Sequence, residues 1–143
     1  RVVLYGKDPF EFVQLSDANL RHQTEYELRS KLIQLRRLYI PASVSLEKLC
    51  DLMSDSLASF AALFRAVLLL HGQPAPVAKP DCVRMTARLL KLDVTPFEKI
   101  FQFRAGGDLP GSETEANELF GAYMLQIERV VEAVDELTMS DKL

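Results

Sequence analysis

The sequence has no tryptophan, and only two histidines and two cysteines occur among its 143 residues. Cys50 and Cys82 are far apart, and the histidines complete no zinc-binding spacing with them. Cys50 falls on the apolar face of a predicted helix, where a free thiol behaves as a small hydrophobic group. This cysteine usage is typical of a reduced, cytoplasmic protein, and we expect no metal site in the chain.

Long apolar runs and processing signals are also lacking. Arg65 interrupts the longest apolar run and Gly72 ends it, short of the roughly 20 residues that a membrane span needs. The chain opens at Arg1 without a signal-peptide pattern, so we expect a protein that does not enter a membrane and that is a piece of a longer chain.

Recognisable catalytic motifs are absent from the sequence. Gly106-Gly107 lacks the Lys-Ser/Thr that follows in a phosphate-binding loop, and no serine or cysteine lies in a nucleophile motif. The sequence therefore offers no firm catalytic residue.

Charge is modest in total but uneven along the chain. The net charge of −3 does not indicate a nucleic-acid binder, although it leaves nucleic acid possible. Residues 17–39 contain five Lys or Arg and three acidic residues, whereas residues 112–143 contain two and eight. We expect the first and last helices to attract each other or a partner of opposite charge; a solvated surface is the alternative.

Proline, glycine and capping residues divide the chain into segments. Pro41 is expected to end the first helix, and three prolines make residues 73–80 a connector. Capping boxes at Thr95–Glu98 and Ser112–Glu115 each predict a helix start. The predicted helices cover about 17–39, 45–71, 81–92, 95–105 and 112–137. This pattern predicts an all-α, up-and-down bundle over residues 16–143, preceded by an extended segment, residues 1–15, left from a preceding domain.

The predicted helix 45–71 changes character halfway along. Its first half has a polar back, whereas its second half is apolar all round, so we expect its own bundle or a partner to cover it on every side. A ridge of small side chains runs along that half and would let another helix approach closely. The ridge consists of Ala58, Ser59, Ala62 and Ala66. A homodimer through helix 45–71 is therefore one possibility, and an intramolecular neighbour is the other.

Five basic residues are candidate substrate-binding residues, and two of them are also candidate catalytic residues. Lys31 projects at the apolar margin of the first helix, where its amine needs a partner or a route to solvent. Arg29 and Arg36 lie on the same helix. His71 lies on the apolar stripe at the end of helix 45–71, with Arg65 about 100° away around the axis; a histidine there also suits capping of the last carbonyls.

The segment from Arg65 to His71 resembles the arginine–histidine motif of HEPN helical domains. In nuclease members, two protomers bring such motifs together over RNA. By this resemblance Arg65 would contact phosphate, and His71 would serve proton transfer or orientation. The chain departs from the pattern at Ala66, because ribonuclease members usually carry a polar residue after the arginine.

A second resemblance covers nearly the whole chain. Segments 2–10 and 21–39 look like the region downstream of the catalytic domain in predicted prokaryotic nucleotidyltransferases, and segments 64–72 and 123–137 look like the helical tail of the same proteins. That tail is related to the substrate-binding C-terminal bundle of kanamycin nucleotidyltransferase and distantly to HEPN.

The catalytic half of such proteins carries Gly-Ser followed by an Asp-x-Asp pair that holds magnesium around a nucleoside triphosphate. Here Gly111-Ser112 opens a helix and the sequence contains no Asp-x-Asp. Magnesium and a nucleoside triphosphate are thus expected only in a separate N-terminal catalytic domain.

Three functional hypotheses follow. The leading one is a non-catalytic accessory domain of a nucleotidyltransferase that contributes acceptor binding, oligomerisation or both, with Arg29, Lys31, Arg36, Arg65 and His71 as binding residues. The second is a HEPN-type ribonuclease or nucleotide-binding domain that uses Arg65 and His71. The third is a purely structural interaction module.

Overall fold

The computed structural model describes the backbone of residues 17–141 and the side chains of residues 19–137. The described part of the chain is all α-helical and consists of five helices. These are α2 (Asp17–Ala42), α3 (Leu46–Leu70), α4 (Lys79–Leu90), α5 (Thr95–Arg104) and α6 (Glu113–Asp141). The predicted helical-bundle class is confirmed, whereas the predicted extended segment, residues 1–15, lies outside the described residues.

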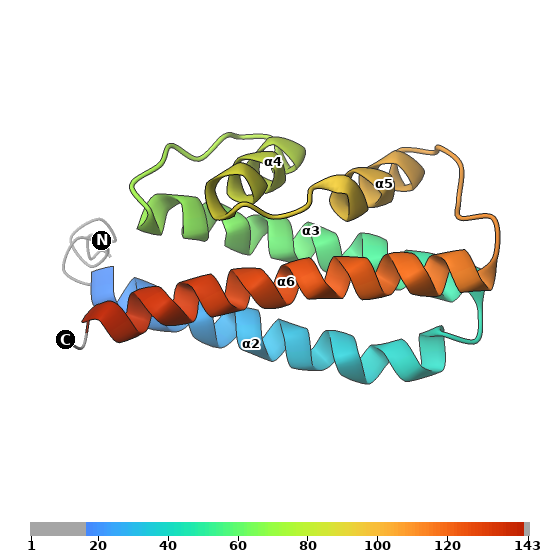
Figure 1. Cartoon of the computed structure of the whole chain (residues 1–143), viewed down its shortest axis with the longest axis horizontal. Helices are drawn as coiled ribbons and strands as arrows, with labels where there is room; N and C mark the ends of the chain where they lie inside the picture. Colours follow the sequence, from blue (N-terminus) through green and yellow to red (C-terminus); the bar gives the residue numbers. More distant parts are fainter. Residues whose placement is uncertain (1–16, 142–143) are drawn as a thin grey trace, which may run out of the picture.

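The three long helices α2, α3 and α6 run along the long axis of the molecule, and α4 and α5 lie over α3 (Figure 1). Helices α2 and α3 run in opposite directions, and α6 runs in the same direction as α3, because α4 and α5 lead the chain back to the end of the bundle where α3 begins (Figure 1). The beginning of α2 and the end of α6 lie at one end of the bundle, and the α5–α6 connection lies at the other (Figure 1).

Helix α3 is the central helix, because it packs against each of the other four. Its buried side chains include Met53, Leu57, Phe60, Phe64 and Val67. By length and composition alone α3 could cross a membrane, a criterion that the core helix of a bundle also meets. The bundle itself covers α3 only in part, because its neighbours do not close around the whole helix and leave Ala62 and Leu69 exposed. Cover of this remaining surface by a partner, the other alternative, stays a prediction.

A chain of aromatic rings fills the core between α3, α5 and α6. Phe97 of α5 meets Phe64 and Tyr123 edge-on, each with ring centroids 6.0 Å apart. The Tyr123 hydroxyl is 2.8 Å from Ser56 Oγ, and burial raises the pKa of this phenol well above its ordinary value. Burying a phenylalanine side chain stabilises a fold by about 2–3 kcal/mol, so these contacts fix α5 and α6 against α3.

The prediction that the first helix ends before Pro41 is wrong. Helix α2 continues through Pro41 to Ala42. Pro41 lies in the last turn, where its missing N–H costs one hydrogen bond only. The next turn still closes, because the Ser43 amide donates to the Tyr39 carbonyl at 2.8 Å.

One predicted capping box forms and the other does not. At the start of α6 the Glu115 amide donates to Ser112 Oγ at 3.1 Å, and the Glu115 carboxylate accepts from the Gly111 amide at 3.0 Å. At the start of α5 it is Asp93 whose carboxylate accepts from the Thr95 amide at 3.0 Å. The predicted partner there, Glu98, instead binds an arginine of α4, a tertiary contact that sequence spacing cannot show.

Candidate functional site

The structure does not bring the five predicted binding residues together. Arg29 and Arg36 lie on the side of α2 that faces α6, whereas Lys31 lies on the side that faces α3. Arg65 and His71 lie at the C-terminal end of α3. The five side chains therefore serve at least three separate surfaces.

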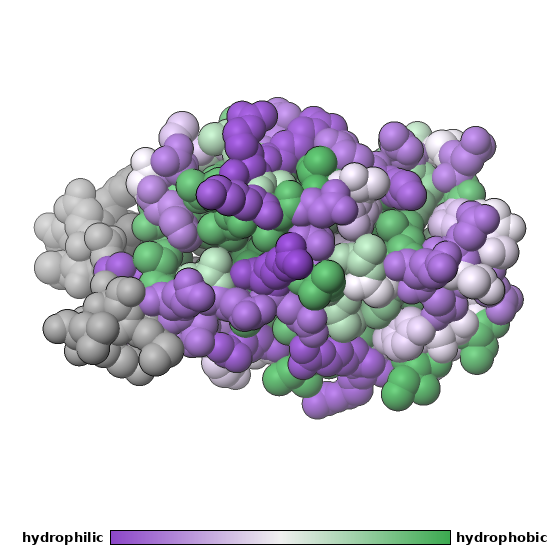
Figure 2. All heavy atoms as spheres, viewed as in Figure 1, coloured by the Kyte–Doolittle hydropathy of each residue, from purple (hydrophilic) through white to green (hydrophobic). Residues whose placement is uncertain are grey.

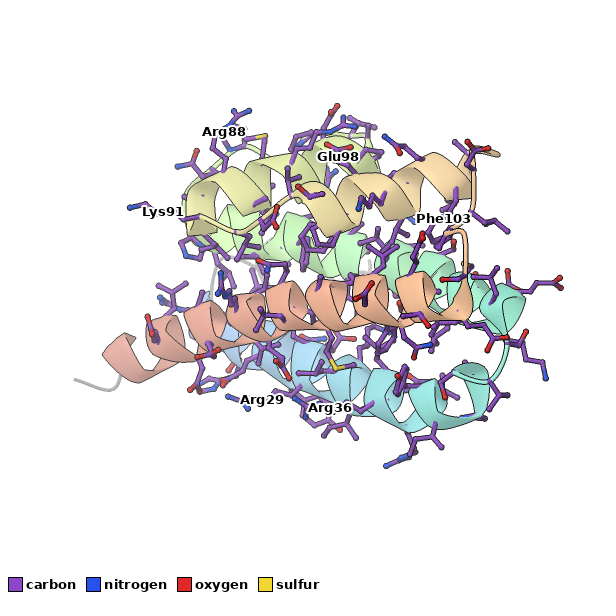
Figure 3. All side chains as sticks on the ribbon, turned by 45° about the vertical axis from the view of Figure 1, so that its right-hand side comes forward. Arg29, Arg36, Arg88, Lys91, Glu98 and Phe103 are labelled. Carbon is purple, nitrogen blue, oxygen red and sulfur yellow. The ribbon has the colours of Figure 1, made fainter. Side chains whose placement is uncertain are left out.

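The two arginines of α2 make the contacts that the charge pattern predicts. Arg36 Nη2 is 2.7 Å from Glu128 Oε2, and Arg29 Nη2 is 3.2 Å from Asp135 Oδ1 on the same helix, α6. Figure 3 shows where both arginines lie along α2. The predicted attraction between the first and last helices is confirmed, and each such surface pair contributes about 0–1 kcal/mol.

Arg65 holds the connector between α3 and α4. Its Nη1 donates to the Pro76 carbonyl at 2.7 Å, and the buried Cys82 thiol donates to the same oxygen at 3.1 Å. Two helices are thereby tied to one carbonyl of the proline-rich connector. This contact gives Arg65 a structural role at the place where a phosphate contact was predicted.

His71 caps the C-terminus of α3. Its backbone amide donates to the carbonyls of Val67 and Leu68, and its Nδ1 donates to the Val67 carbonyl at 2.9 Å. The predicted capping role is therefore confirmed. Because Nδ1 is occupied, Nε2 is the ring nitrogen left for other contacts.

Lys31 lines an open groove between α2 and α3, with a volume of about 200 Å³. Asp55 and Ser59 of α3 lie on the facing wall, and Leu38 of α2 adds apolar surface. Because the groove opens to solvent, the half-buried Lys31 can extend its amine toward water, as expected of a snorkelling lysine.

A larger groove, between α5 and α6, was not predicted. Its volume is about 540 Å³, and the loop that joins the two helices forms one end of it. We call it the α5–α6 groove. Its apolar lining includes Pro96, Phe103, Leu109, Pro110 and Leu119, and its charged lining is Asp93, Lys99, Asp108, Glu115 and Glu118. Phe103 points between α5 and α6 in Figure 3.

The four carboxylates of the α5–α6 groove fall into two pairs. Asp93 and Glu115 cap the helix starts, and the hydrogen bonds from the Thr95 backbone hold the pKa of Asp93 below its usual range. Asp108 and Glu118 have no hydrogen-bond or ion-pair partner among the described residues. These two carboxylates are therefore available to a ligand.

The glycines after α5 shape the end of this groove. Gly106 has a φ of +97°, which only glycine adopts without strain. A Cβ on Gly107 would lie 2.7 Å from the Gln102 carbonyl oxygen, which accepts a hydrogen bond from the Gly107 amide at 2.8 Å. The Gly-Gly pair thus turns the chain back toward α6, and it was the sequence signal for the groove.

An ion pair also joins the two short helices, α4 and α5. Arg84 of α4 binds both carboxylate oxygens of Glu98 on α5, at 2.7 and 3.0 Å, and also Asp81 at 3.2 Å. The arginine hydrogen bonds hold the pKa of Glu98 below its usual range. This pair fixes α4 to α5 rather than marking a reactive site.

Among the described residues, no group of three or more His, Cys, Asp or Glu side chains is arranged to hold a metal ion. The chain matches no protein-family model, no curated protein and no solved structure. Functional inference therefore depends on the chain's own geometry.

Proposed function

We propose that this chain is a non-catalytic helical accessory domain of a nucleotidyltransferase and that it binds the acceptor substrate in the α5–α6 groove. The observation that carries the proposal is the pair of unpartnered carboxylates, Asp108 and Glu118, beside an apolar wall in a groove of about 540 Å³. Such a combination of apolar surface and few polar groups is typical of ligand sites.

The chemistry of the groove favours a cationic acceptor. Asp108 and Glu118 would bind ammonium groups, and Phe103 and Leu119 would contact the carbon skeleton. Lys99, the one basic residue of the lining, would face a hydroxyl or anionic group of the same acceptor.

The contacts of the two candidate catalytic residues support a structural role for them instead of chemistry. Arg65 and His71 both bond to backbone carbonyls of their own chain, and they lie at the opposite end of the bundle from the α5–α6 groove (Figure 1). A ribonuclease that uses them would have to break or share these bonds. Incubation of the purified chain with RNA tests this alternative directly.

Acceptor binding is tested with spermine as a cationic probe, titrated by isothermal calorimetry. We expect binding that weakens about thirtyfold or more in the Asp108→Asn, Glu118→Gln double variant, because each of the two charge-assisted contacts is worth about 1 kcal/mol or more. A matched control removes two acidic charges elsewhere on α6, with Glu132→Gln and Glu136→Gln. Equal weakening in both variants, or no binding by the wild type, would contradict the proposed site.

The link to a nucleotidyltransferase has a separate test. The codons that precede Arg1 should encode Gly-Ser followed by Asp-x-Asp, and the resulting longer chain should transfer nucleotides only with magnesium. A preceding sequence without this pattern would remove the nucleotidyltransferase from the proposal and leave a binding or structural module.

Oligomerisation through α3 belongs to the same proposal. Ser59, Ala62 and Leu69 are exposed side chains in the second half of α3. If α3 mediates a dimer, Ala62→Glu should shift the mass measured by light scattering from dimer to monomer. A wild type that is monomeric at high concentration would exclude this part of the proposal.

A further inference from the structure

Hydrophobic and hydrophilic side chains are interspersed over the face of the molecule that Figure 2 shows, so hydropathy by itself does not distinguish one part of that face. A ligand site is better recognised where apolar walls and a few polar groups converge in one groove. Besides the α5–α6 groove, such groups converge between α2 and α3, in the groove of about 200 Å³ that Lys31 lines. We call it the α2–α3 groove.

One side of each helix lines the α2–α3 groove, because the lining residues recur at helical spacing. The lining consists of Lys31, Gln34, Leu35 and Leu38 from α2 and of Leu52, Asp55, Ser56, Ser59 and Phe60 from α3. Leu35 and Phe60 are buried, whereas Leu38 is half-exposed and widens the apolar surface toward solvent. Both walls of the groove therefore combine apolar and polar side chains.

The α2–α3 groove contains one positive and one negative side chain, and the two are not paired. Lys31 belongs to the α2 wall and Asp55 to the α3 wall. Neither has a hydrogen-bond or ion-pair partner among the described residues, so they do not contact each other either. A ligand with a single charge would leave one of these groups without a partner. A zwitterion would pair with both.

Ser56 adds a hydrogen-bond acceptor beside Asp55. The Ser56 hydroxyl donates to the Met53 carbonyl at 3.1 Å. The proton of its 2.8 Å bond with Tyr123 therefore comes from the Tyr123 hydroxyl, which is buried and keeps its proton because burial raises its pKa. A hydroxyl oxygen has two lone pairs, so Ser56 keeps one lone pair and no free proton. The α3 wall therefore favours a hydrogen-bond donor, such as an ammonium group.

We propose that the α2–α3 groove binds a free amino acid with an apolar side chain. Its carboxylate pairs with Lys31, its ammonium group donates to Asp55 and Ser56, and its side chain lies against Leu38 and Leu52. The groove is smaller than the roughly 300–1,000 Å³ of clefts that hold drug-sized ligands, which favours so small a molecule. It shares no lining residue with the α5–α6 groove, so this inference does not depend on the proposed acceptor site.

The probe is L-leucine, titrated into the ¹⁵N-labelled chain and followed by amide shifts in NMR spectra. We expect shifts centred on the lining of the α2–α3 groove and a dissociation constant of about 1 mM, as suits a small ligand with few contacts. Two analogues each lack one charge: 4-methylpentanoate has no ammonium group, and isoamylamine has no carboxylate. Each should bind about fivefold more weakly than leucine, because it loses a charge-assisted contact.

Two variants assign the charges of the ligand to the walls of the groove. Lys31→Met should weaken leucine about fivefold without weakening isoamylamine, and Asp55→Asn should weaken leucine without weakening 4-methylpentanoate. The matched controls, Lys48→Met and Asp51→Asn, change exposed residues of α3 outside the groove and should leave the binding of all three compounds unchanged. The comparison of analogues on the wild type tests the same point without any substitution.

Three results would overturn this proposal. The first is the absence of shifts at a leucine concentration ten times the expected dissociation constant. The second is an analogue that binds as tightly as leucine, which would show that the groove does not select a zwitterion. The third is a double-mutant cycle in which Lys31→Met and Asp55→Asn are strongly coupled in the free protein, which would show that the two side chains pair with each other and need no ligand.

Discussion

Helices α2 and α3 are nearly equal in length, with 26 and 25 residues, but they use their apolar side chains differently. Helix α3 contacts all four other helices and buries most of its large apolar residues. Helix α2 packs mainly against α3 and α6 and leaves Tyr26 and Ile40 mostly exposed. The difference shows that α3 places most of its large apolar side chains in the core, whereas α2 leaves more of its own exposed to solvent.

The arginines of the two helices differ in the same way. Arg65 of α3 is committed to the Pro76 carbonyl, whereas Arg37 of α2 has no partner among the described residues. We expect that removing a side chain with a partner inside the chain lowers stability, and that removing an exposed side chain without one leaves stability unchanged.

The largest expected effect is on the core of α3. Phe64→Ala should lower the free energy of unfolding by about 3–5 kcal/mol, because it removes a fully buried ring that packs against Phe97. Urea denaturation measures the change. The control, Ile33→Ala on α2, should change stability by no more than about 0.5 kcal/mol. A comparable loss in both variants would show that α2's outer side chains are structural after all.

A smaller effect is expected at the end of α3. Arg65→Ala should destabilise the fold by about 1 kcal/mol, because the Pro76 carbonyl loses a charge-assisted donor. Arg37→Ala, the matched control on α2, should lie within about 0.5 kcal/mol of the wild type. Hydrogen exchange should show that opening is local to residues 73–80; unchanged protection there would argue against Arg65 holding the connector.

The ion pairs between α2 and α6 should contribute less. Arg36→Ala should lower stability by about 0.5 kcal/mol at low salt, because the Arg36–Glu128 pair is half exposed. The difference in stability between this variant and the wild type should shrink in 0.5 M sodium chloride. At that salt concentration the Debye length is roughly 4 Å, and interactions between exposed charges are screened. A larger, salt-independent loss would indicate that the aliphatic part of Arg36 packs in the core.

The smallest effect concerns pH. Pairing with Arg84 lowers the folded-state pKa of Glu98 below its ordinary value of 4.5, so this pair stabilises the fold above that pH. The contribution is lost as pH falls through the lowered, folded-state pKa. Glu98→Gln should therefore flatten the acid limb of stability against pH, measured by thermal denaturation. An acid limb identical to that of the wild type would show that other carboxylates dominate it.

Much of the fold could be predicted from the sequence because its signals are local. Helical spacing of apolar residues predicted the long helices, and the Ser112–Glu115 capping box forms as expected. The end of α2 was placed too early, because Pro41 disfavours a helix interior but is tolerated in a last turn. The spacing of Thr95 and Glu98 predicts a capping role for Glu98. Its actual pairing with Arg84 depends on how α4 packs against α5, which the local sequence does not show.

The candidate site was harder to predict because it depends on contacts between distant segments. Asp108 and Glu118 line the same groove only because the chain turns at Gly106 and Gly107. The exposure of Leu69 could not be foreseen either, since periodicity shows which residues share a face but not how many neighbours cover it. The contact of α2 with α6 could be predicted because opposite charges favour contact between two helices that are far apart in the sequence.

The central claim is that Arg65 and His71 serve structure and that the chain acts by binding. Its most direct test is incubation of the purified chain with RNA, with and without magnesium, beside the His71→Ala variant. We predict intact RNA in every sample. Cleavage by the wild type that is lost in His71→Ala, while the variant remains folded, would contradict the claim and establish a ribonuclease.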